Sequence, residues 1–259
     1  MIEMRRAVQQ NYSLESIDRM ALVLKALEQA PEQSLDQVAR ASGLNESTAL
    51  RYLLSLGKHE LVERNEASGR FRLGLSLFRL GTRSIGYRDI VTLSLPVMER
   101  LLAEFGESVN LATRQQGQVV LLKVLESAVP TRKGAKAGET DTWHATSLGK
   151  AMLSAMEAAE VVALVGSEPM AGITPNTLLR HDDLLRDLQR TMQRGYAIDD
   201  EESVEGLRCV GAAIRDHAGV PRYALSVSGP KSRMPYQRTE EIGTALVAGA
   251  AEVSKGLGA

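Results

Sequence analysis

Apolar residues near the start of the chain recur at helical spacing. Ile17, Met20, Ala21, Leu24 and Leu27 fall on one face of a helix and predict an amphipathic segment. Two shorter apolar patterns follow directly, within residues 34–56. The sequence therefore predicts a small unit in which one supporting helix packs against a pair of short helices.

The segment Ser34–Leu56 (SLDQVARASGLNESTALRYLLSL) has the form of two helices around a tight turn. Gly43 can adopt the positive φ of a sharp corner, and Asn45 is a good N-cap for the second helix. The residues predicted to face outward on that helix are Ser47, Thr48, Leu50, Arg51 and Ser55. An ordinary helical hairpin is the alternative, but hydroxyls and an arginine suit contacts in the DNA major groove. Ser47, Thr48 and Arg51 are therefore the candidate DNA-reading residues.

The residues after the helical pair strengthen the DNA-binding interpretation. Residues 63–73 (ERNEASGRFRL) predict two short strands around an Asn/Ser/Gly turn. Arg64, Arg70 and Arg72 lie near the tip of this hairpin. A helical pair followed by a basic hairpin is a winged helix-turn-helix, whose wing places cations on the sugar–phosphate backbone. We expect this domain to span residues 14–74.

The rest of the chain follows a different plan. Residues 75–87 predict a linker helix, and Ile90, Leu93, Val97, Leu101 and Phe105 mark a long amphipathic helix. Further strands and helices then follow in mixed order. The strands are expected at residues 108–114, 119–126, 196–199, 207–215 and 222–228, and the helices at 146–156, 184–192 and near the C-terminus. This order predicts an α+β ligand-binding domain over residues 88–259.

Composition limits where and how the protein can work. The 259 residues have 44% hydrophobic content, no apolar run near the ~20 residues that span a membrane, and one cysteine. The N-terminus lacks a signal-peptide core, so we expect a cytoplasmic protein with no membrane partner. The net charge is −1. Residues 1–86 hold 12 Lys/Arg and 10 Asp/Glu, and residues 87–259 hold 19 Lys/Arg and 22 Asp/Glu. DNA binding must then depend on a few arginines and on two copies of the domain.

Several separated motifs together resemble the IclR family of bacterial transcriptional regulators. They are HATSLGK at 144–150, GYAIDDEE at 195–202, GLRC at 206–209 and LSVSGP at 225–230, in the family's order after a winged helix-turn-helix. The resemblance covers roughly residues 16–255. It implies a GAF-like C-terminal domain that binds a small metabolite, often an organic acid. It also implies a homodimer or a dimer of dimers on double-stranded operator DNA.

The resemblance and local helix chemistry together suggest an effector site. Thr146 can cap a helix, which leaves the N–H groups of Ser147, Leu148 and Gly149 at its positive end, where a carboxylate is favoured. Asp199 and Cys209 match family positions that contact the effector, and Asp199 suits a hydroxyl, an amine or a hydrated carbonyl. Trp143 replaces a small aliphatic residue of the family. Its ring could either fill space, favouring a compact acid, or stack on an aromatic effector.

Enzymatic and metal-binding alternatives find little support in the residues. Leu148-Gly149-Lys150 lacks the Ser or Thr and the opening glycine of a phosphate-binding loop. Cys209 could pair with His144 as a thiol hydrolase, or bind zinc with His144, His181 or His217, but no spacing supports either. We therefore expect no catalytic residue, no metal and no cofactor. The alternative function is an architectural DNA-binding protein without an effector.

Overall fold

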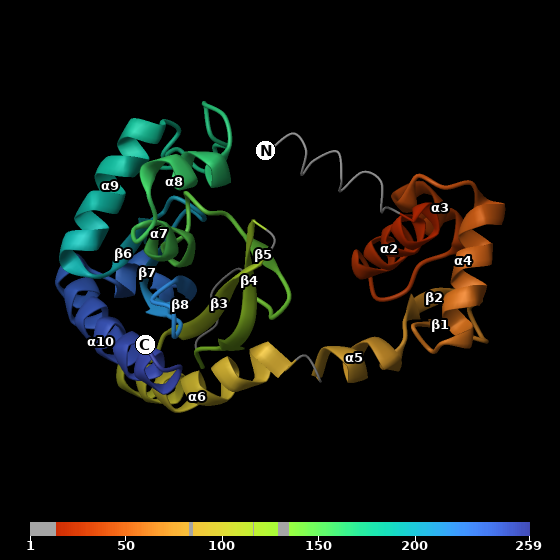
Figure 1. Cartoon of the computed structure of the whole chain (residues 1–259), viewed down its shortest axis with the longest axis horizontal. Coiled ribbons are helices and arrows are strands. Elements are labelled where there is room, and N and C mark those ends of the chain that lie inside the picture. The colour runs from red at the N-terminus through yellow and green to blue at the C-terminus, as the bar shows by residue number, and fades with distance from the viewer. Residues whose placement is uncertain (1–13, 83–84, 116, 129–134) are drawn as a thin grey trace. The chain divides into compact units, whose positions relative to one another are not determined.

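The computed structural model describes residues 14–82, 85–115, 117–128 and 135–259 (Figure 1). The chain divides between Ile85 and Gly86 into two compact units. The division falls inside the segment predicted as a linker helix. The described residues of that segment, predicted at 75–87, are helical: they form α5 (Leu75–Thr82) and the start of α6 (Ile85–Phe105), and residues 83–84 lie outside the described residues.

The N-terminal unit has the predicted helix-turn-helix. α2 (Glu15–Glu28), α3 (Leu35–Ser42) and α4 (Glu46–Lys58) enclose a core that includes Val23, Leu27 and Leu53. Ser34 caps α3 through a reciprocal capping box with Gln37, and Gly43 ends that helix in the left-handed conformation. Asn45 caps α4 by accepting from the Thr48 N–H. The corner between the two helices is therefore fixed by local sequence.

Two details of the predicted apolar pattern are wrong. Ile17 and Ala21 are exposed, because the buried positions of α2 are Val23, Ala26 and Leu27 in its second half. Leu50, expected to face outward, is half-buried and packs against the core. The core is small, so it covers only part of each helix.

The predicted wing is present as a two-stranded antiparallel hairpin. β1 (Val62–Arg64) pairs with β2 (Phe71–Leu73), with Glu63 opposite Arg72. Gly69 supplies a positive φ in the connecting turn. Phe71 lies in the core and also forms a bridge with Gln33, so the wing is joined to the segment between α2 and α3.

The C-terminal unit is built on one antiparallel six-stranded sheet in the order β5-β4-β3-β8-β7-β6. Its strands are β3 (Ser108–Gln115), β4 (Gln118–Leu125), β5 (Thr140–Asp141), β6 (Ala197–Asp200), β7 (Leu207–Arg215) and β8 (Pro221–Pro230). The central strands β3, β8 and β7 are buried on both faces. Successive side chains of these strands point to opposite faces of the sheet, and the sheet separates two layers of helices.

Helices cover both faces of this sheet (Figure 1). α6 and α10 (Tyr236–Gly256) pack on odd-numbered positions of β3 and β8, such as Leu111 and Leu225. The opposite face carries α7 (Ser147–Leu153), α8 (Ala158–Val165) and α9 (His181–Arg194). The predicted α+β class is confirmed. α8 and β5 were not predicted, and α7 ends at Leu153, three residues before the predicted end.

Candidate functional site

The exposed face of α4 carries the residues predicted to read DNA. Ser47 and Arg51 are exposed, and Thr48 is half-buried. The Ser47 hydroxyl donates to Asn45 Oδ1 at 2.8 Å, so it is held at the helix start. Among the residues that the structure describes, Arg51 forms no ion pair, and its guanidinium is available to a phosphate or a base edge.

The three wing arginines differ in their local partners. Arg72 Nε donates to Glu63 Oε2 at 3.0 Å across the hairpin, and this bond lowers the pKa of the Glu63 carboxyl. Arg64 Nε donates to the Gly69 carbonyl at 3.4 Å and its guanidinium lies over the Phe71 ring. Arg70 is exposed and forms no ion pair within the described part of the chain. Its charge is therefore less compensated than that of Arg72.

The C-terminal unit encloses a cavity of about 390 Å³ between the sheet and the start of α7. Its sheet wall consists of side chains from neighbouring strands. The strand residues are Ser108, Asn110, Leu121, Val124, Thr140, Asp141, Asp199, Leu207, Cys209, Ser226 and Ser228. Thr142, Thr146, Ser147 and Leu148 form a second wall, and Ser203 and Val204 a third. A volume of this size fits a small molecule.

A row of polar side chains crosses four adjacent strands on the cavity side of the sheet. Asp199 lies opposite Cys209, Cys209 opposite Ser228, and Ser228 opposite Ser108. The Cys209 thiol contacts both Asp199 and Ser228, and burial raises the pKa of this thiol well above its usual value. Asn110 Nδ2 donates to Ser226 Oγ at 3.2 Å and to Ser228 Oγ at 3.1 Å. The row supplies neutral hydrogen-bonding groups beside one carboxylate.

Asp199 is held in a fixed orientation. Its Oδ1 accepts from the backbone N–H of Glu202 at 2.8 Å and of Ser203 at 3.2 Å, and its Oδ2 accepts from Ser203 Oγ at 2.5 Å. Burial raises the pKa of Asp199, although these hydrogen bonds and Lys150 oppose the shift. The carboxylate can therefore accept a hydrogen bond from a ligand without first having to reorient.

The start of α7 lies directly on the sheet. Thr146 caps the helix, since its Oγ1 accepts from the Gly149 N–H at 3.2 Å. The N–H groups of Ser147 and Leu148 precede the first intrahelical bond and have no acceptor within the helix. A Cβ at Gly149 would lie 2.3 Å from the Trp143 carbonyl oxygen, so only glycine permits this close approach. These contacts place the helix start against the cavity.

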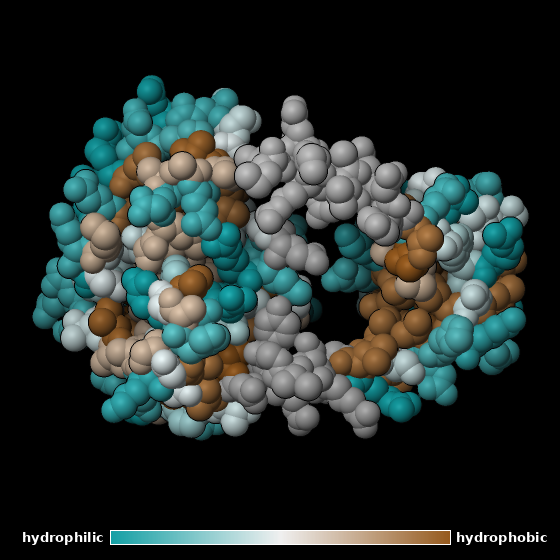
Figure 2. All heavy atoms as spheres, viewed as in Figure 1, coloured by the Kyte–Doolittle hydropathy of each residue, from teal (hydrophilic) through white to brown (hydrophobic). Residues whose placement is uncertain are grey.

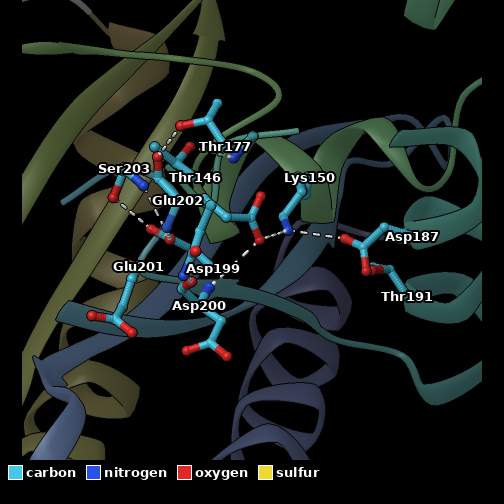
Figure 3. A network of polar contacts seen from close by, with 12 residues as sticks. Thr146, Lys150, Thr177, Asp187, Thr191, Asp199, Asp200, Glu201, Glu202 and Ser203 are labelled. Atoms are coloured by element: carbon cyan, nitrogen blue, oxygen red, sulfur yellow. Dashed lines mark hydrogen bonds and ion pairs between the residues drawn. The ribbon is translucent and has the colours of Figure 1, made fainter. Parts of the chain in front are cut away.

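Behind the cavity lies a buried ionic cluster (Figure 3). Lys150 is completely buried, and its Nζ lies 2.5 Å from Glu202 Oε1 and 2.9 Å from Asp187 Oδ2. Burial by itself would lower the pKa of Lys150, but the two carboxylates raise it. Burial also raises the pKa of Glu202 to about 7, despite the attraction of Lys150. The cluster joins α7, α9 and the turn after β6.

The structure brings four of the six predicted effector residues to the cavity wall. Ser147, Leu148, Asp199 and Cys209 line it, whereas Trp143 and Gly149 are not among its lining residues. Trp143 is buried in the core around α7, and its Nε1 donates to the Gly117 carbonyl at 2.7 Å. Trp143 is therefore set back from the described cavity wall.

Sequence reasoning missed most of the polar wall on β3 and β8. Ser108 and Asn110 on β3, and Ser226 and Ser228 on β8, line the cavity. A signal was present, because each pair is spaced by two residues within an apolar strand. Polar side chains repeating on one face of a buried strand are uncommon unless that face borders a cavity or a polar network.

The cavity wall has a distinctive charge pattern. Four carboxylates line it: Asp199 inside, Asp141 half-buried, and Glu126 and Glu139 exposed. Among the residues that the structure describes, no lysine, arginine or histidine and no aromatic side chain belongs to the lining. A carboxylate bound here would depend on backbone N–H groups and hydroxyls.

Two further properties concern the described residues only. None of their helices is both long and apolar enough to cross a bilayer. They also contain no group of three or more His, Cys, Asp or Glu side chains arranged to hold a metal ion.

A winged helix-turn-helix unit followed by an α+β unit that contains a cavity is the architecture of a DNA-binding transcriptional regulator. Residues 16–66 match the IclR helix-turn-helix domain, and residues 82–255 match the bacterial transcriptional regulator IclR C-terminal domain. The chain belongs to the IclR family of bacterial transcriptional regulators. The resemblance inferred from the separated motifs is therefore confirmed.

Relatives cover nearly the whole chain. The HTH-type transcriptional repressor AllR of Escherichia coli K12 is 32% identical over 245 residues, covering 94% of this chain and 90% of its own. The AllR of Salmonella typhi is 33% identical with the same coverage.

Solved structures agree with this fold. An IclR regulator from Alicyclobacillus acidocaldarius has a TM-score of 0.85 at 24% identity, covering 95% of this chain and all of its own. An IclR homologue from Microbacterium hydrocarbonoxydans, solved with 4-hydroxybenzoate, has a TM-score of 0.82 at 25% identity, covering 94% and 99%.

Proposed function

We propose that the protein is a ligand-responsive transcriptional repressor that controls genes for the uptake or breakdown of its effector. We further propose that the effector is a small organic acid with a second polar group. The observation that carries this proposal is the cavity, which combines the start of α7 with the buried carboxylate of Asp199. Curated relatives similar over 94% of the chain are repressors, which supports the direction of control. Operator DNA would place its action in the bacterial cytoplasm.

The two ends of such an effector would meet different walls. Its carboxylate would accept from the N–H groups of Ser147 and Leu148, where the helix dipole favours an anion. Its hydroxyl or amine would donate to Asp199, and Cys209 would border the same end. A carboxylate beside Asp199 would be repelled, so this orientation is favoured over the reverse.

We propose a compact rather than an aromatic effector. The described lining contains no aromatic side chain, and Trp143 is buried in the core around α7. An aromatic ring would meet aliphatic side chains of the lining, such as Leu121, Leu148 and Ile173, and no ring on which to stack. Small hydroxy- or keto-acids can instead use the hydroxyl-rich sheet wall.

We also propose that operator binding requires a homodimer or a dimer of dimers. One recognition helix reads too few base pairs for a specific genomic site, so two copies on a palindrome are needed. Figure 2 shows apolar residues gathered on one face of the N-terminal unit. On α5, Leu75, Phe78 and Leu80 are each more than 60% exposed. Covering these side chains would stabilise a dimer through the hydrophobic effect.

In the DNA complex, α4 would lie in the major groove and the wing would lie along the backbone. Ser47, Thr48 and Arg51 would reach base edges or adjacent phosphates, and Arg64, Arg70 and Arg72 would contact phosphates. The effector would favour one arrangement of the two DNA-binding units in the dimer. A coupling free energy of about 1–3 kcal/mol is typical for such allosteric regulators.

A ligand panel tests this function against the architectural alternative. The thermal midpoint of the full chain is measured with glycolate, L-lactate, D-glycerate, pyruvate, benzoate and 4-hydroxybenzoate. A sensor would be stabilised by at least one compact acid, and the same acid would change its affinity for operator DNA. An unchanged midpoint and unchanged DNA affinity with all six acids would favour the architectural protein.

Asp199→Asn sharpens this test because it keeps the shape of the side chain. The loss of a charged acceptor should weaken binding of the stabilising acid by about 1.5–3 kcal/mol. Glu126→Gln changes an exposed carboxylate of the lining and is the matched control. Unchanged affinity in Asp199→Asn would remove Asp199 from the effector site.

A further inference from the structure

Glu202 is a buried carboxylate directly behind the cavity wall (Figure 3). Its backbone N–H donates to Asp199 Oδ1, and its Oε1 lies 2.5 Å from Lys150 Nζ. Lys150 belongs to α7, three residues after Ser147, where the proposed effector carboxylate would bind. Glu202 is thus bonded to Asp199 in the cavity wall and to Lys150 of α7, although it does not itself line the cavity.

The charges around Glu202 do not balance. Lys150 faces it from α7, Asp187 from α9 and Asp199 from β6. These groups are one buried ammonium and, with Glu202, three carboxylates within the described residues. Lys150 cannot neutralise all three, and burial raises the pKa of Glu202 to about 7. The cluster therefore carries an excess of buried negative charge, which favours uptake of a proton by one of its carboxylates.

Glu202 is the member of the cluster best placed to accept that proton. Asp199 accepts hydrogen bonds from two backbone N–H groups and from Ser203, and all three favour its ionised form. Glu202 Oε2 is buried and has no hydrogen-bond partner among the described residues. The partners that favour ionised Glu202, Lys150 Nζ and the Asp200 N–H, both lie at Oε1, which leaves Oε2 able to carry a proton. Additional negative charge nearby then favours the protonated form of Glu202.

We propose that binding of the acidic effector is coupled to uptake of one proton from solvent by Glu202. This inference rests on the proposed function, because it takes the effector to be an anion bound in the cavity that Asp199 lines. The added carboxylate disfavours the ionised form of Glu202, so the carboxylate becomes a neutral carboxyl group. By linkage, the effector binds more tightly as pH falls through neutrality. The regulator would then respond to acid and pH together.

Calorimetry on the full-length protein measures this proton directly. Binding of glycolate, L-lactate, D-glycerate and pyruvate is titrated at pH 7.5 in phosphate, HEPES and Tris, whose ionisation enthalpies differ. These acids are fully ionised at that pH, so any proton taken up belongs to the protein. For each acid that binds, the observed enthalpy should vary with buffer and report an uptake of about half a proton or more. Affinity should fall about fivefold between pH 6.5 and 8.

Two variants assign the proton to Glu202. Glu202→Gln should remove the buffer dependence and flatten the pH profile. Asp187→Asn removes a neighbouring carboxylate and should reduce the uptake, providing a second variant if the first does not fold. Glu201→Gln is the matched control: this carboxyl pairs with Lys231, and that bond lowers its pKa. The control should retain the full uptake.

The outcomes separate the two proposals. Failure of all four acids to bind the wild-type protein would overturn the proposed effector class, and the proton coupling with it. Binding with no proton uptake would overturn only the coupling. Uptake that persists unchanged in both Glu202→Gln and Asp187→Asn would assign the proton to another group and would also overturn it.

Discussion

Gly211 on β7 lies directly beneath Ser147, the first residue of α7. A Cβ at Gly211 would come within 2.6 Å of the Ser147 carbonyl oxygen, closer than side-chain atoms approach in folded proteins. The missing side chain allows the start of the helix to rest on the sheet. Because Ser147 and Leu148 line the cavity, this contact sets the depth of the candidate effector site.

Gly211→Ala should therefore displace the start of α7 and impair effector binding. The clash involves backbone atoms, so relief requires a shift of the helix and should destabilise the C-terminal unit by about 1–3 kcal/mol. Urea unfolding measures the stability, and calorimetry with the stabilising acid measures the affinity. Gly57→Ala is the control, since its Cβ would meet only an ordinary contact at 3.7 Å. Wild-type affinity in Gly211→Ala would show that the helix start does not define the site.

Arg51→Ala should weaken specific operator binding by about 1–3 kcal/mol, because Arg51 is an exposed donor on the reading face of α4. The fold should be intact, since the side chain contributes nothing to the core. Gel-shift titrations with operator and scrambled DNA measure the effect. Arg19→Ala removes an arginine paired with Glu15 on α2 and serves as the control. Full operator affinity in Arg51→Ala would exclude this residue from readout.

The wing arginines Arg70 and Arg72 should contribute unequally to DNA affinity. Arg70→Ala should weaken binding to all DNA sequences alike and reduce the salt slope by about one unit. Arg72→Ala should have a smaller effect, because Glu63 already neutralises part of its charge. Binding measured over a range of salt concentrations gives both slopes. A change in sequence preference with an unchanged slope would mean that the wing reads bases.

The stability of the C-terminal unit should fall as pH rises from about 4.5 to 7. The pKa of Glu202 is raised to about 7, so the folded state binds more protons than the unfolded state in this window. The stabilisation is complete below the pKa of Glu202 in the unfolded chain and is lost as pH rises through its pKa in the folded protein. It amounts to at most about 3 kcal/mol. Urea unfolding at several pH values should give a flatter profile for Glu202→Gln. Parallel profiles for the two proteins would refute the assignment.

Local chemistry made the N-terminal unit predictable. Gly43 and Asn45 act through their own backbone and nearest neighbours, so the turn and the cap follow from residue type alone. The exposure of Ile17 and the partial burial of Leu50 depended instead on how far the small core reaches along each helix. Periodicity identifies an apolar stripe, but the packing partner determines which end of it is covered.

The cavity required the tertiary structure. The separated motifs indicated Ser147, Asp199 and Cys209, but the alignment of Cys209 with Ser228 depends on strand pairing between residues distant in sequence. The position of Trp143 also depends on a long-range contact, because its Nε1 donates to the carbonyl of Gly117 in the turn between β3 and β4.

The sequence by itself determined the kind of protein, because caps, turns and helical periods act over a few residues and the family motifs preserve their order. The depth, charge and walls of the effector site were decided only by the folded chain. Lys150 and Glu202 are 52 residues apart, and their opposed charges meet only after α7, α9 and β6 have packed. Electrostatic interaction in a buried site depends on distance and desolvation, and neither quantity exists until the fold has formed.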